Sequence, residues 1–306
     1  MKKGDTYLMS NSVSDIENII YKYIPTAKGY QQDVLSAMDY AFLAGGKRIR
    51  PMMMKLCFDM LSESLDTYDE SVIGPFMAAI EMIHTSSLIH DDLPALDNDE
   101  LRRGKPTVHV KYGEDVAILA GDGLLNYAYE TAAKAFSIKP GDAGIEKAFA
   151  ILASKAGVYG MLGGQSLDVV MTGKELSDDK LEFIYLNKTS ALIESSMMVG
   201  AALAGADDTL VSKLEEAARA VGMAFQVQDD ILDIKGDEAV IGKPVHSDEK
   251  NDKYTYATIH GIEESKKYVK EMSDKANAII RGIAVKNDSA REELCSLINA
   301  LIDRDR

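Results

Sequence analysis

The sequence predicts an all-α protein, a helical bundle around a deep central cavity. Apolar residues recur at helical spacing in seven long windows, and no segment alternates apolar and polar residues as a half-buried strand would. The 306 residues are 46% hydrophobic and 27% charged, which is enough apolar content for a sizeable core. No linker rich in proline or serine divides the chain, so we expect one domain over residues 1–306, with residues 1–12 loose.

The predicted helices follow from runs of good helix formers. The glycine pair at 45–46 marks the end of the first window, because Val34, Leu35, Met38 and Phe42 precede it at helical spacing. Ser177 and the two aspartates after it are capping candidates for a later window. In chain order, the windows cover residues 34–44, 72–91, 115–135, 144–171, 179–204, 208–232 and 262–281.

The charge and composition of the chain argue against a nucleic-acid-binding protein, a disulfide-stabilised protein and a membrane-inserted protein. The chain has 34 Lys and Arg against 49 Asp and Glu, a formal net charge of −15, so we expect no nucleic-acid partner. Its two cysteines, Cys57 and Cys295, are too few for a disulfide framework and indicate a reducing cytoplasm. No apolar run is long enough to predict a signal peptide or stable membrane insertion.

The window 72–91 changes character along its length. Its first part places on one stripe the apolar residues Ile73, Phe76, Met77, Ile80 and Ile83. The helical repeat brings His84, Ser87 and Asp91 onto the same stripe. A helix whose inward face turns polar is predicted to line a cavity, and a carboxylate buried there needs a positive partner.

Two acidic clusters stand at the ends of two predicted helices. The first reads HDDLPALDNDE over residues 90–100, and the second reads QVQDDILD over residues 226–233. Asp229 and Asp233 lie one helical turn apart, with Gln226 near the same side. Such carboxylates repel unless a cation joins them, and Mg²⁺ takes carboxylate oxygens together with phosphate and water. For either cluster alone, a solvated acidic helix end is the alternative.

The same cationic tripeptide, GKP, follows each acidic cluster. It begins 13 positions after the first aspartate in both cases, since 104 − 91 and 242 − 229 both equal 13. Two compact basic segments, GGKRIRP at 45–51 and LRRGKP at 101–106, also stand out in an acidic chain. Together these patterns predict two facing half-sites in which Mg²⁺ joins carboxylates to a diphosphate, above an apolar shaft for a hydrocarbon tail.

Four motifs, taken in order, carry a family resemblance. They are GGKRIRP (45–51), HDDLPALDNDELRRGKPT (90–107), KT (188–189) and FQVQDDILD (225–233). From about residue 13 onward the chain resembles the trans-isoprenyl diphosphate synthases, the farnesyl and geranylgeranyl diphosphate synthases of the polyprenyl synthetase family. The resemblance implies an isoprenoid synthase fold, a cytoplasmic homodimer, three Mg²⁺ per active site, and condensation of isopentenyl diphosphate with a C5 to C15 allylic diphosphate.

The resemblance also assigns roles by position. The metal ligands are Asp91, Asp92, Asp97, Asp229 and Asp233. The residues that grip the allylic diphosphate are Arg102, Lys188, Lys243 and Lys253. Those that grip isopentenyl diphosphate are Lys47, Arg50, His84 and Arg103. The catalytic residues are Lys188, Thr189 and Gln226, and the oxygens of Thr189 and Gln226 face the developing allylic cation. Without the motifs, His84 would be read as a hydrogen-bonded core histidine, and Lys188 as a lysine whose side chain reaches solvent. The motif context outweighs both alternatives.

The resemblance connects product length to the position five residues before the first aspartate. An aromatic residue there often stops growth at C15 in this family, whereas this chain has Ser86, next to Ser87. We therefore expect a C20 product, geranylgeranyl diphosphate, because one further helix turn adds about 5 Å of depth. Helix geometry aligns Ser87, rather than Ser86, with Asp91. Farnesyl diphosphate synthase is the alternative, and the preferred allylic starter stays open.

Three rival classes are weighed against the same motifs. A class I terpene cyclase shares an aspartate-rich Mg²⁺ site but has a different second metal motif. An HD-type phosphohydrolase needs a histidine well upstream of His90, and the chain offers only His84 on the same predicted helix. A non-catalytic partner subunit usually loses one aspartate cluster, and here both are intact.

Overall fold

The computed structural model describes residues 13–62, 67–235 and 254–302 and divides into two compact units. Unit 1 comprises Met1–Met52 and Asp66–Asp142, and unit 2 comprises Met53–Leu65 and Ala143–Arg306. Nearly all regular structure in the described part is helical, which confirms the all-α prediction. The prediction of a single domain stays a prediction.

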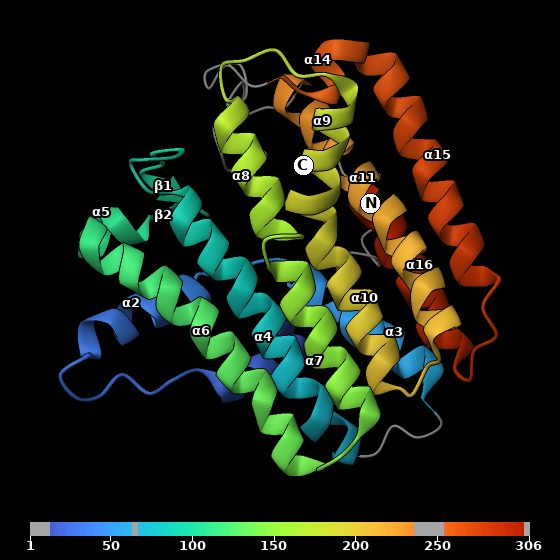
Figure 1. The fold of residues 1–306 in the computed structure, drawn as a ribbon, viewed down its shortest axis with the longest axis horizontal. Coiled ribbons are helices and arrows are strands. Elements are labelled where there is room, and N and C mark those ends of the chain that lie inside the picture. The colour runs from blue at the N-terminus through green and yellow to red at the C-terminus, as the bar shows by residue number, and fades with distance from the viewer. Residues whose placement is uncertain (1–12, 63–66, 236–253, 303–306) are drawn as a thin grey trace. The chain divides into compact units, whose positions relative to one another are not determined.

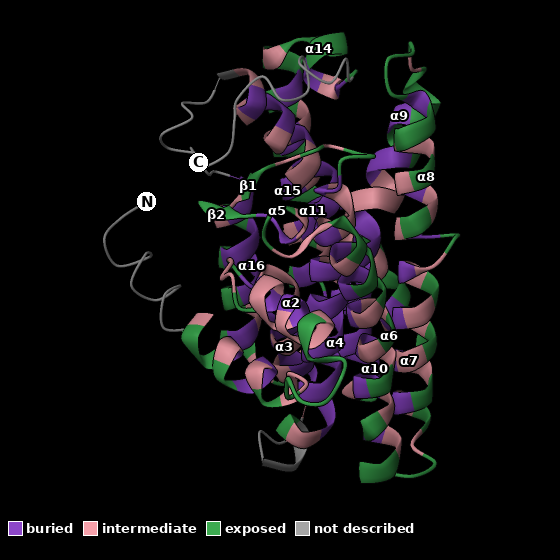
Figure 2. Ribbon diagram, turned by 90° about the vertical axis from the view of Figure 1, so that its left-hand side faces the viewer, coloured by how far each residue is buried: buried purple, intermediate pink, exposed green. Residues whose placement is uncertain are grey.

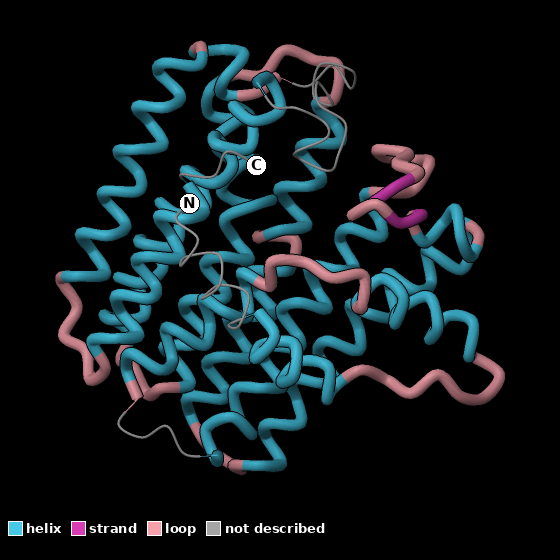
Figure 3. Tube along the Cα trace, turned by 180° about the vertical axis from the view of Figure 1, so that it is seen from behind, coloured by secondary structure: helices cyan, strands magenta, loops and turns pink. Residues whose placement is uncertain are grey.

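Unit 1 is built around two long helices that run side by side, α4 and α6 (Figure 1). Residues 13–20 are helical and precede the short helix η1. An antiparallel hairpin with the register Leu101↔Pro106 follows α4 (Figure 3). The elements are η1 (Tyr21–Tyr23), α2 (Gln32–Phe42), the start of α3 (Ile49–Leu61), α4 (Thr67–Asp91), β1 (Leu101–Arg102), β2 (Lys105–Pro106), α5 (Val108–Tyr112) and α6 (Glu114–Ile138).

Helix α4 is the most buried long element of unit 1 (Figure 2). The five apolar residues predicted to share a stripe, from Ile73 to Ile83, are each at most 3% exposed. By length and composition Glu70–Asp91 would suffice to cross a membrane, but 83% of its most apolar stretch is buried inside the protein. The apolar character of α4 is therefore used in the core, where it fixes the direction in which its polar end points.

Unit 2 packs its helices around α10 and α11. Helix α11 lies along α15, and α10 contacts both α7 and α11 (Figure 1). The elements are the remainder of α3, then α7 (Ala143–Ala156), α8 (Met161–Met171), α9 (Asp178–Ile184), the π-helix η2 (Tyr185–Ser190), α10 (Ala191–Leu203), α11 (Asp208–Lys235), α14 (Tyr256–His260), α15 (Ile262–Arg281) and α16 (Asp288–Ile302).

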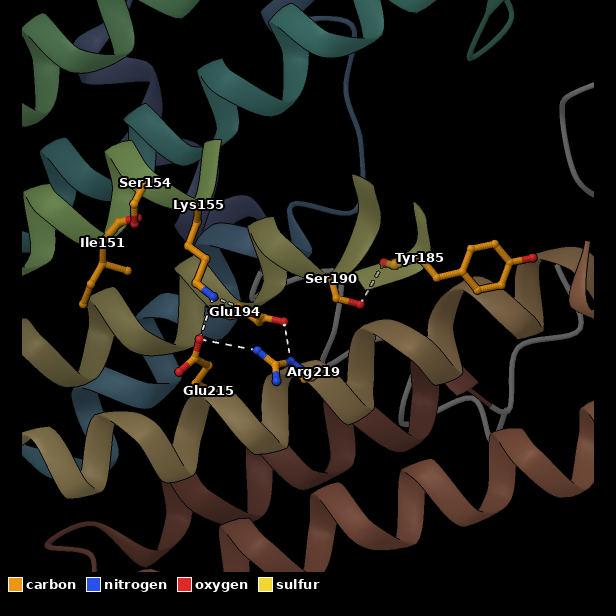
Figure 4. Close-up of polar contacts among 8 residues, drawn as sticks. All are labelled: Ile151, Ser154, Lys155, Tyr185, Ser190, Glu194, Glu215 and Arg219. Atoms are coloured by element: carbon orange, nitrogen blue, oxygen red, sulfur yellow. Dashed lines mark hydrogen bonds and ion pairs between the residues drawn. The ribbon is translucent and has the colours of Figure 1, made fainter. Parts of the chain in front are cut away.

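A buried ionic cluster joins three of these helices. The Glu194 carboxylate, on α10, is 2% exposed and accepts hydrogen bonds from Lys155 of α7 and Arg219 of α11, as Figure 4 shows. Lys155 also donates to Glu215 at 2.7 Å. A buried carboxylate is tolerable when it has such partners, and removing one would leave an uncompensated charge. The cluster thus fixes how α7, α10 and α11 are aligned along their axes.

The sequence missed several breaks and short elements. The window 144–171 is split into α7 and α8 by a turn at 157–160, where Val158 and Tyr159 are 63% and 94% exposed. Helices α3, α14 and α16 and the hairpin were not predicted as elements. Ser177 does stand before α9, but its side chain makes no capping hydrogen bond. The hairpin and α14 are too short to show a long amphipathic period, whereas α16 does have one, with Leu294, Leu297, Ile298 and Leu301 buried.

Candidate active site

The last turns of α4 carry a line of partly exposed side chains along a helix that is otherwise buried. These residues recur at helical spacing and are His84, Ser87, Leu88 and Asp91. Ser86, by contrast, is 3% exposed, and its hydroxyl donates to the Ile83 carbonyl at 2.8 Å. The Ser87 hydroxyl bonds the His84 carbonyl in the same way. The predicted alignment of His84, Ser87 and Asp91 is therefore present, and Ser87 rather than Ser86 belongs to it.

A buried arginine anchors the loop that precedes this half of the site. Arg48 is 2% exposed and donates to the buried carboxylate of Glu81 at 2.7 Å and to Glu17 at 3.1 Å. Its guanidinium also lies over the rings of Tyr21 and Phe42. The backbone at Arg48 has φ +48, a left-handed conformation that costs energy for a non-glycine residue. These contacts hold the turn between two predicted ligands of isopentenyl diphosphate, residues 47 and 50.

Positive charge is concentrated around His84. Burial lowers the pKa of His84 well below its usual value, and the charges of Arg50, Arg103, Arg102 and Arg48 lower it further. Burial also lowers the pKa of Arg50. Among the described residues, the buried Nε of Arg50 has no hydrogen-bond partner. Since Arg48 is paired with Glu81 and Arg102 with Asp92, the surplus positive charge comes from Arg50 and Arg103, and it makes this region suited to an anion.

The second aspartate of the first cluster is held by the hairpin. Asp92 is 3% exposed, and its carboxylate accepts two hydrogen bonds from Arg102 Nε at 2.7 and 3.0 Å, with Arg102 Nη2 at 2.5 Å. After α4 the chain turns back, so that the Asp97 amide donates to the Asp91 carbonyl at 2.9 Å. Asp91 and Asp97 are partly exposed. The turn thus places the first and third aspartates of the motif beside each other in the backbone.

The hairpin turn explains the position of Arg103. Its two turn residues, Arg103 and Gly104, have φ +54 and +73, as a two-residue turn of the I′ type requires. Arg103 then donates to the Gly45 carbonyl. A Cβ on Gly46 would lie 2.8 Å from the nearest guanidinium nitrogen. The glycine pair, predicted as a helix end, therefore also makes room for a cationic side chain.

In unit 2, the Lys188-Thr189 pair lies on the π-helix η2. Here the helix is wider by one residue per turn, and the Ser190 hydroxyl donates to the Tyr185 carbonyl at 3.1 Å (Figure 4). Neighbouring helices approach this segment closely because they have glycines there. A Cβ on Gly164 would lie 2.1 Å from the backbone nitrogen of Lys188, and one on Gly222 would lie 2.2 Å from Ser190 Oγ.

The predicted catalytic side chains of unit 2 lie together. Thr189 donates to the Gln226 Oε1 at 2.7 Å, and Lys188 donates to Asp168 of α8 at 2.5 Å. All four residues line a pocket of about 100 Å³ in this unit. The sequence grouping of Lys188, Thr189 and Gln226 is thus reproduced in the structure.

The second aspartate of the other cluster, Asp230, is buried beneath these residues. It is 2% exposed, and its Oδ1 accepts from Gln226 Nε2 at 3.2 Å. Its Oδ2 accepts from the Tyr185 hydroxyl at 2.5 Å and from the Tyr256 amide at 3.1 Å. Asp229 is partly exposed, and Asp233, one turn further along α11, is 7% exposed. The pair of aspartates therefore consists of one outer and one inner carboxylate.

The remaining predicted residues are placed as follows. Lys47 is exposed in the loop before α3. Lys243 and Lys253 lie outside the described residues, as does the second GKP tripeptide. His90, to which no chemistry was assigned, lies with its Nε2 3.3 Å from the Ile118 carbonyl of α6, over Gly121. Among the described residues, no three Asp, Glu, His or Cys side chains form a group that would hold a metal ion.

Five residues that shape the two half-sites were not predicted from the sequence. Arg48 lies inside a motif whose other basic residues were chosen as ligands, so only its burial separates it from them. Asp230 is adjacent to Asp229, and the sequence does not tell which one points inward. Asp168 follows Gly164, whose close approach to Lys188 is visible only in the structure. The other two are Glu81 and Tyr185.

Comparison with known proteins gives one consistent result. A family model described as Polyprenyl synthetase matches residues 31–293. The chain is 40% identical to the farnesyl diphosphate synthase of Geobacillus stearothermophilus over 285 residues, which are 93% of this chain and 94% of the relative. It is 42% identical over 262 residues to the geranylgeranyl diphosphate synthase of Cyanophora paradoxa, covering 85% of each.

Two further matches extend this picture. Over 252 residues the chain is 42% identical to a chloroplastic Arabidopsis thaliana protein, the heterodimeric geranylgeranyl pyrophosphate synthase large subunit 1, covering 80% of this chain and 66% of that one. Among solved structures, a Helicobacter pylori geranyltransferase complexed with magnesium and isoprenyl diphosphate aligns with a TM-score of 0.86 and 28% identity, covering 99% of both chains.

Proposed function

Because the chain belongs to the polyprenyl synthetase family, we propose that it is a short-chain trans-prenyltransferase. Its substrates are isopentenyl diphosphate and a C5, C10 or C15 allylic diphosphate. The observation that carries the proposal is the cationic cluster of unit 1, where the buried Nε of Arg50 has no hydrogen-bond partner among the described residues and Arg103 adds a second positive charge, in a chain of net charge −15. A cluster of this kind favours a multiply charged anion such as a diphosphate.

Each half-site contributes a different part of the reaction. Lys47, Arg50, His84 and Arg103 bind isopentenyl diphosphate, and Arg102 and Lys188 bind the allylic diphosphate, together with Lys243 and Lys253. Of the catalytic residues Lys188, Thr189 and Gln226, the last two present side-chain oxygens to the carbon that becomes positive, and the lone pairs of these oxygens stabilise the charge. Condensation further requires that water is excluded from the reacting carbon and that the alkene of isopentenyl diphosphate is held against the cation.

The acidic residues have the donor chemistry that Mg²⁺ requires. Carboxylate oxygens are its usual protein ligands, and it binds through one or two of them together with substrate phosphate. A hydrogen bond from the Asp97 backbone amide to the Asp91 carbonyl brings these two residues beside each other. Asp229 and Asp233 are one turn apart on α11. We propose that these four, with Asp92, hold three ions per site. Bound Mg²⁺ would neutralise the leaving diphosphate.

We propose geranylgeranyl diphosphate as the product. Ser87 is the side chain in line with Asp91 and His84, and its hydroxyl is turned back to the main chain, so it adds no bulk below the aspartates. The next residues toward the start of α4, Met82 and Ile83, are fully buried and would form the floor of the shaft. Farnesyl diphosphate synthase remains the alternative, since relatives of both kinds are similar to this chain.

We further propose a cytoplasmic homodimer. Both cysteines, Cys57 and Cys295, are buried free thiols, as expected in a reducing compartment. In unit 1, Ile118 and Leu119 of α6 are 41% and 55% exposed and would gain from a partner surface. Light scattering of the purified protein tests the dimer.

One assay tests the reaction and the product together. Purified protein is incubated with Mg²⁺, isopentenyl diphosphate and each allylic diphosphate in turn, and the dephosphorylated products are separated by chromatography. Geranylgeraniol as the main product supports the full proposal, whereas dominant farnesol would replace it by the C15 alternative. Hydrocarbon release from an allylic diphosphate alone would indicate a terpene cyclase. Turnover absent with every allylic substrate would indicate a non-catalytic subunit.

A further inference from the structure

We infer that Asp230 is a positioning residue that fixes which way the amide of Gln226 points, so that an oxygen rather than an N–H group is presented beside Thr189. This inference rests on the proposed prenyltransferase function and goes beyond the metal-binding roles given to the neighbouring aspartates. It follows from the hydrogen-bond chemistry of four buried or partly buried groups in unit 2.

The first step is the polarity of Asp230. Its carboxylate is 2% exposed and accepts three hydrogen bonds, from Gln226, the Tyr185 hydroxyl and the Tyr256 amide. An ionised carboxylate only accepts hydrogen bonds. The Gln226 group facing Oδ1 must therefore be the NH₂ end of the amide, whatever orientation would otherwise be favoured.

The second step follows along the side chain of Gln226. Because its NH₂ is turned to Asp230, its Oε1 is turned to Thr189, whose hydroxyl donates to it at 2.7 Å. The Thr189 hydroxyl proton is engaged in this hydrogen bond. The lone pairs that remain on the Thr189 and Gln226 oxygens can therefore face the substrate. Both residues line the pocket together with Lys188. An allylic cation is stabilised by oxygen lone pairs and opposed by an N–H dipole, so the orientation bears on the rate of ionisation.

The third step is that Asp230 is itself firmly held on its other side. Its Oδ2 takes both the Tyr185 hydroxyl and the Tyr256 amide, and the Tyr256 amide also lies 3.0 Å from the Tyr185 hydroxyl oxygen. Tyr185 begins the π-helix that carries Thr189, and its side chain extends away from Ser190 in Figure 4. One oxygen of Asp230 therefore anchors the residue, and the other sets the amide.

This division predicts what an isosteric change would do. In Asp230→Asn, the Tyr185 hydroxyl and the Tyr256 amide can still donate to the carbonyl oxygen of the new side chain. Its NH₂ group then faces Gln226. The Gln226 amide must then turn over and accept with Oε1, which brings its N–H groups to Thr189. We expect kcat to fall at least about tenfold, with KM for both substrates and the half-saturating Mg²⁺ concentration changed by less than about threefold.

The decisive test exchanges the two side chains. In the double variant Asp230→Asn with Gln226→Glu, the new amide donates to one carboxylate oxygen at 226, and the other oxygen again accepts from Thr189. The net charge of the pair is unchanged. We expect this swap to be at least about tenfold more active than either single variant, because Gln226→Glu alone places two carboxylates together.

The outcomes separate this inference from the proposed function. Wild-type protein that forms no prenyl diphosphate overturns the proposed function and the inference with it. If the wild-type protein is active but the double variant turns over no faster than the less active single variant, the inference alone is overturned. A shift in Mg²⁺ half-saturation as large as the loss in kcat would overturn it too, since Asp230 would then act through the metal. Thermal melts monitor folding, and if Asp230→Asn did not fold, the swap would still be judged against Gln226→Glu.

Discussion

The two aspartate pairs of this chain have the same internal order and different surroundings. In each pair the first member, Asp91 or Asp229, is partly exposed, and the second, Asp92 or Asp230, is at most 3% exposed. Asp92 accepts hydrogen bonds from the cation Arg102 on a hairpin, and Asp230 accepts hydrogen bonds from the uncharged groups of Gln226 and Tyr185. The same sequence motif therefore does not imply that the same kind of partner stabilises its inner aspartate.

The difference follows from where each pair stands in its helix. The first pair ends α4, so the chain leaves the helix and a loop supplies the charged partner. The second pair lies inside α11, and its inner member accepts hydrogen bonds from Tyr185 of η2 and Tyr256 of α14. An arginine therefore stabilises the first inner aspartate, and hydrogen bonds from uncharged groups stabilise the second. The four predictions below separate these two modes, starting with the feature that the pairs share.

The largest effect is expected from removing either outer aspartate. Asp91→Ala and Asp229→Ala should each lower turnover by roughly 10³-fold, because each removes a charge that the proposed metal ions require. Neither change should lower the melting temperature appreciably, since both side chains are partly exposed. Steady-state kinetics and thermal melts measure the two quantities.

A matched control is Asp274→Ala on α15, where the side chain is 66% exposed and pairs only with Lys270 among the described residues. It should leave both turnover and melting temperature as in the wild type. Retained turnover in Asp229→Ala alone would break the symmetry between the outer aspartates and restrict the metal site to unit 1.

A somewhat smaller effect is expected from filling the close approach that packs the second half-site. In Gly222→Ala the new methyl would lie 2.2 Å from Ser190 Oγ and 2.6 Å from its Cα, so the π-helix must shift. We expect a loss of about 3 kcal/mol in the free energy of unfolding, together with reduced kcat. Denaturant titration gives the first quantity.

The control for this change is Gly123→Ala in α6, where the nearest atom to an added methyl is the flexible Met38 Sδ at 3.0 Å. The alanine there should be neutral or stabilising. Equal losses at positions 123 and 222 would mean that an added methyl group is costly in either helix, so the close approach of η2 would not explain the result at Gly222.

The long helices of this protein were predictable from sequence because they have one buried face. The apolar stripe from Ile73 to Ile83 and the polar continuation at His84, Ser87 and Asp91 were both read from helical period alone. The motif spacing likewise brought Thr189 together with Gln226. These features depend on local periodicity or on family motifs, which a single sequence displays.

The inner residues were not predictable for equally physical reasons. A π-helix shifts the side-chain period by one residue over a single turn, and no window of the sequence marks Tyr185–Ser190 as different. The choice between Asp229 and Asp230 depends on the donors of Tyr185 and Tyr256, which are distant in sequence. Arg48 differs from its basic neighbours only through long-range contacts with Glu17 and Glu81.

The next prediction compares the inner aspartates directly. Arg102→Met leaves the Asp92 carboxylate buried without its cation, and we expect a loss of about 2 kcal/mol in unfolding free energy, since the arginine side chain itself is 31% exposed. Tyr185→Phe removes the hydroxyl donor to Asp230 and should cost about 1 kcal/mol. Both are measured by denaturant titration. A larger loss for Tyr185→Phe would contradict the view that pairing with a cation matters more for Asp92 than the tyrosine hydrogen bond does for Asp230.

The smallest effect concerns the charge state of His84. Burial and the nearby arginines lower the pKa of this ring in the folded protein, so the unfolded chain takes up the proton first as the pH falls below about 6.5. The contribution to stability is therefore complete above that pH and declines below it. The stability difference between wild type and His84→Gln should fall by about 1 kcal/mol between pH 6.5 and 5.5, because one unit of pH corresponds to that much free energy for a single proton. Denaturant titrations of both proteins at the two pH values cancel the other titrating groups. A constant difference would show that the folded and unfolded chains take up this proton over the same pH range, so burial and the arginines would not lower the pKa of His84.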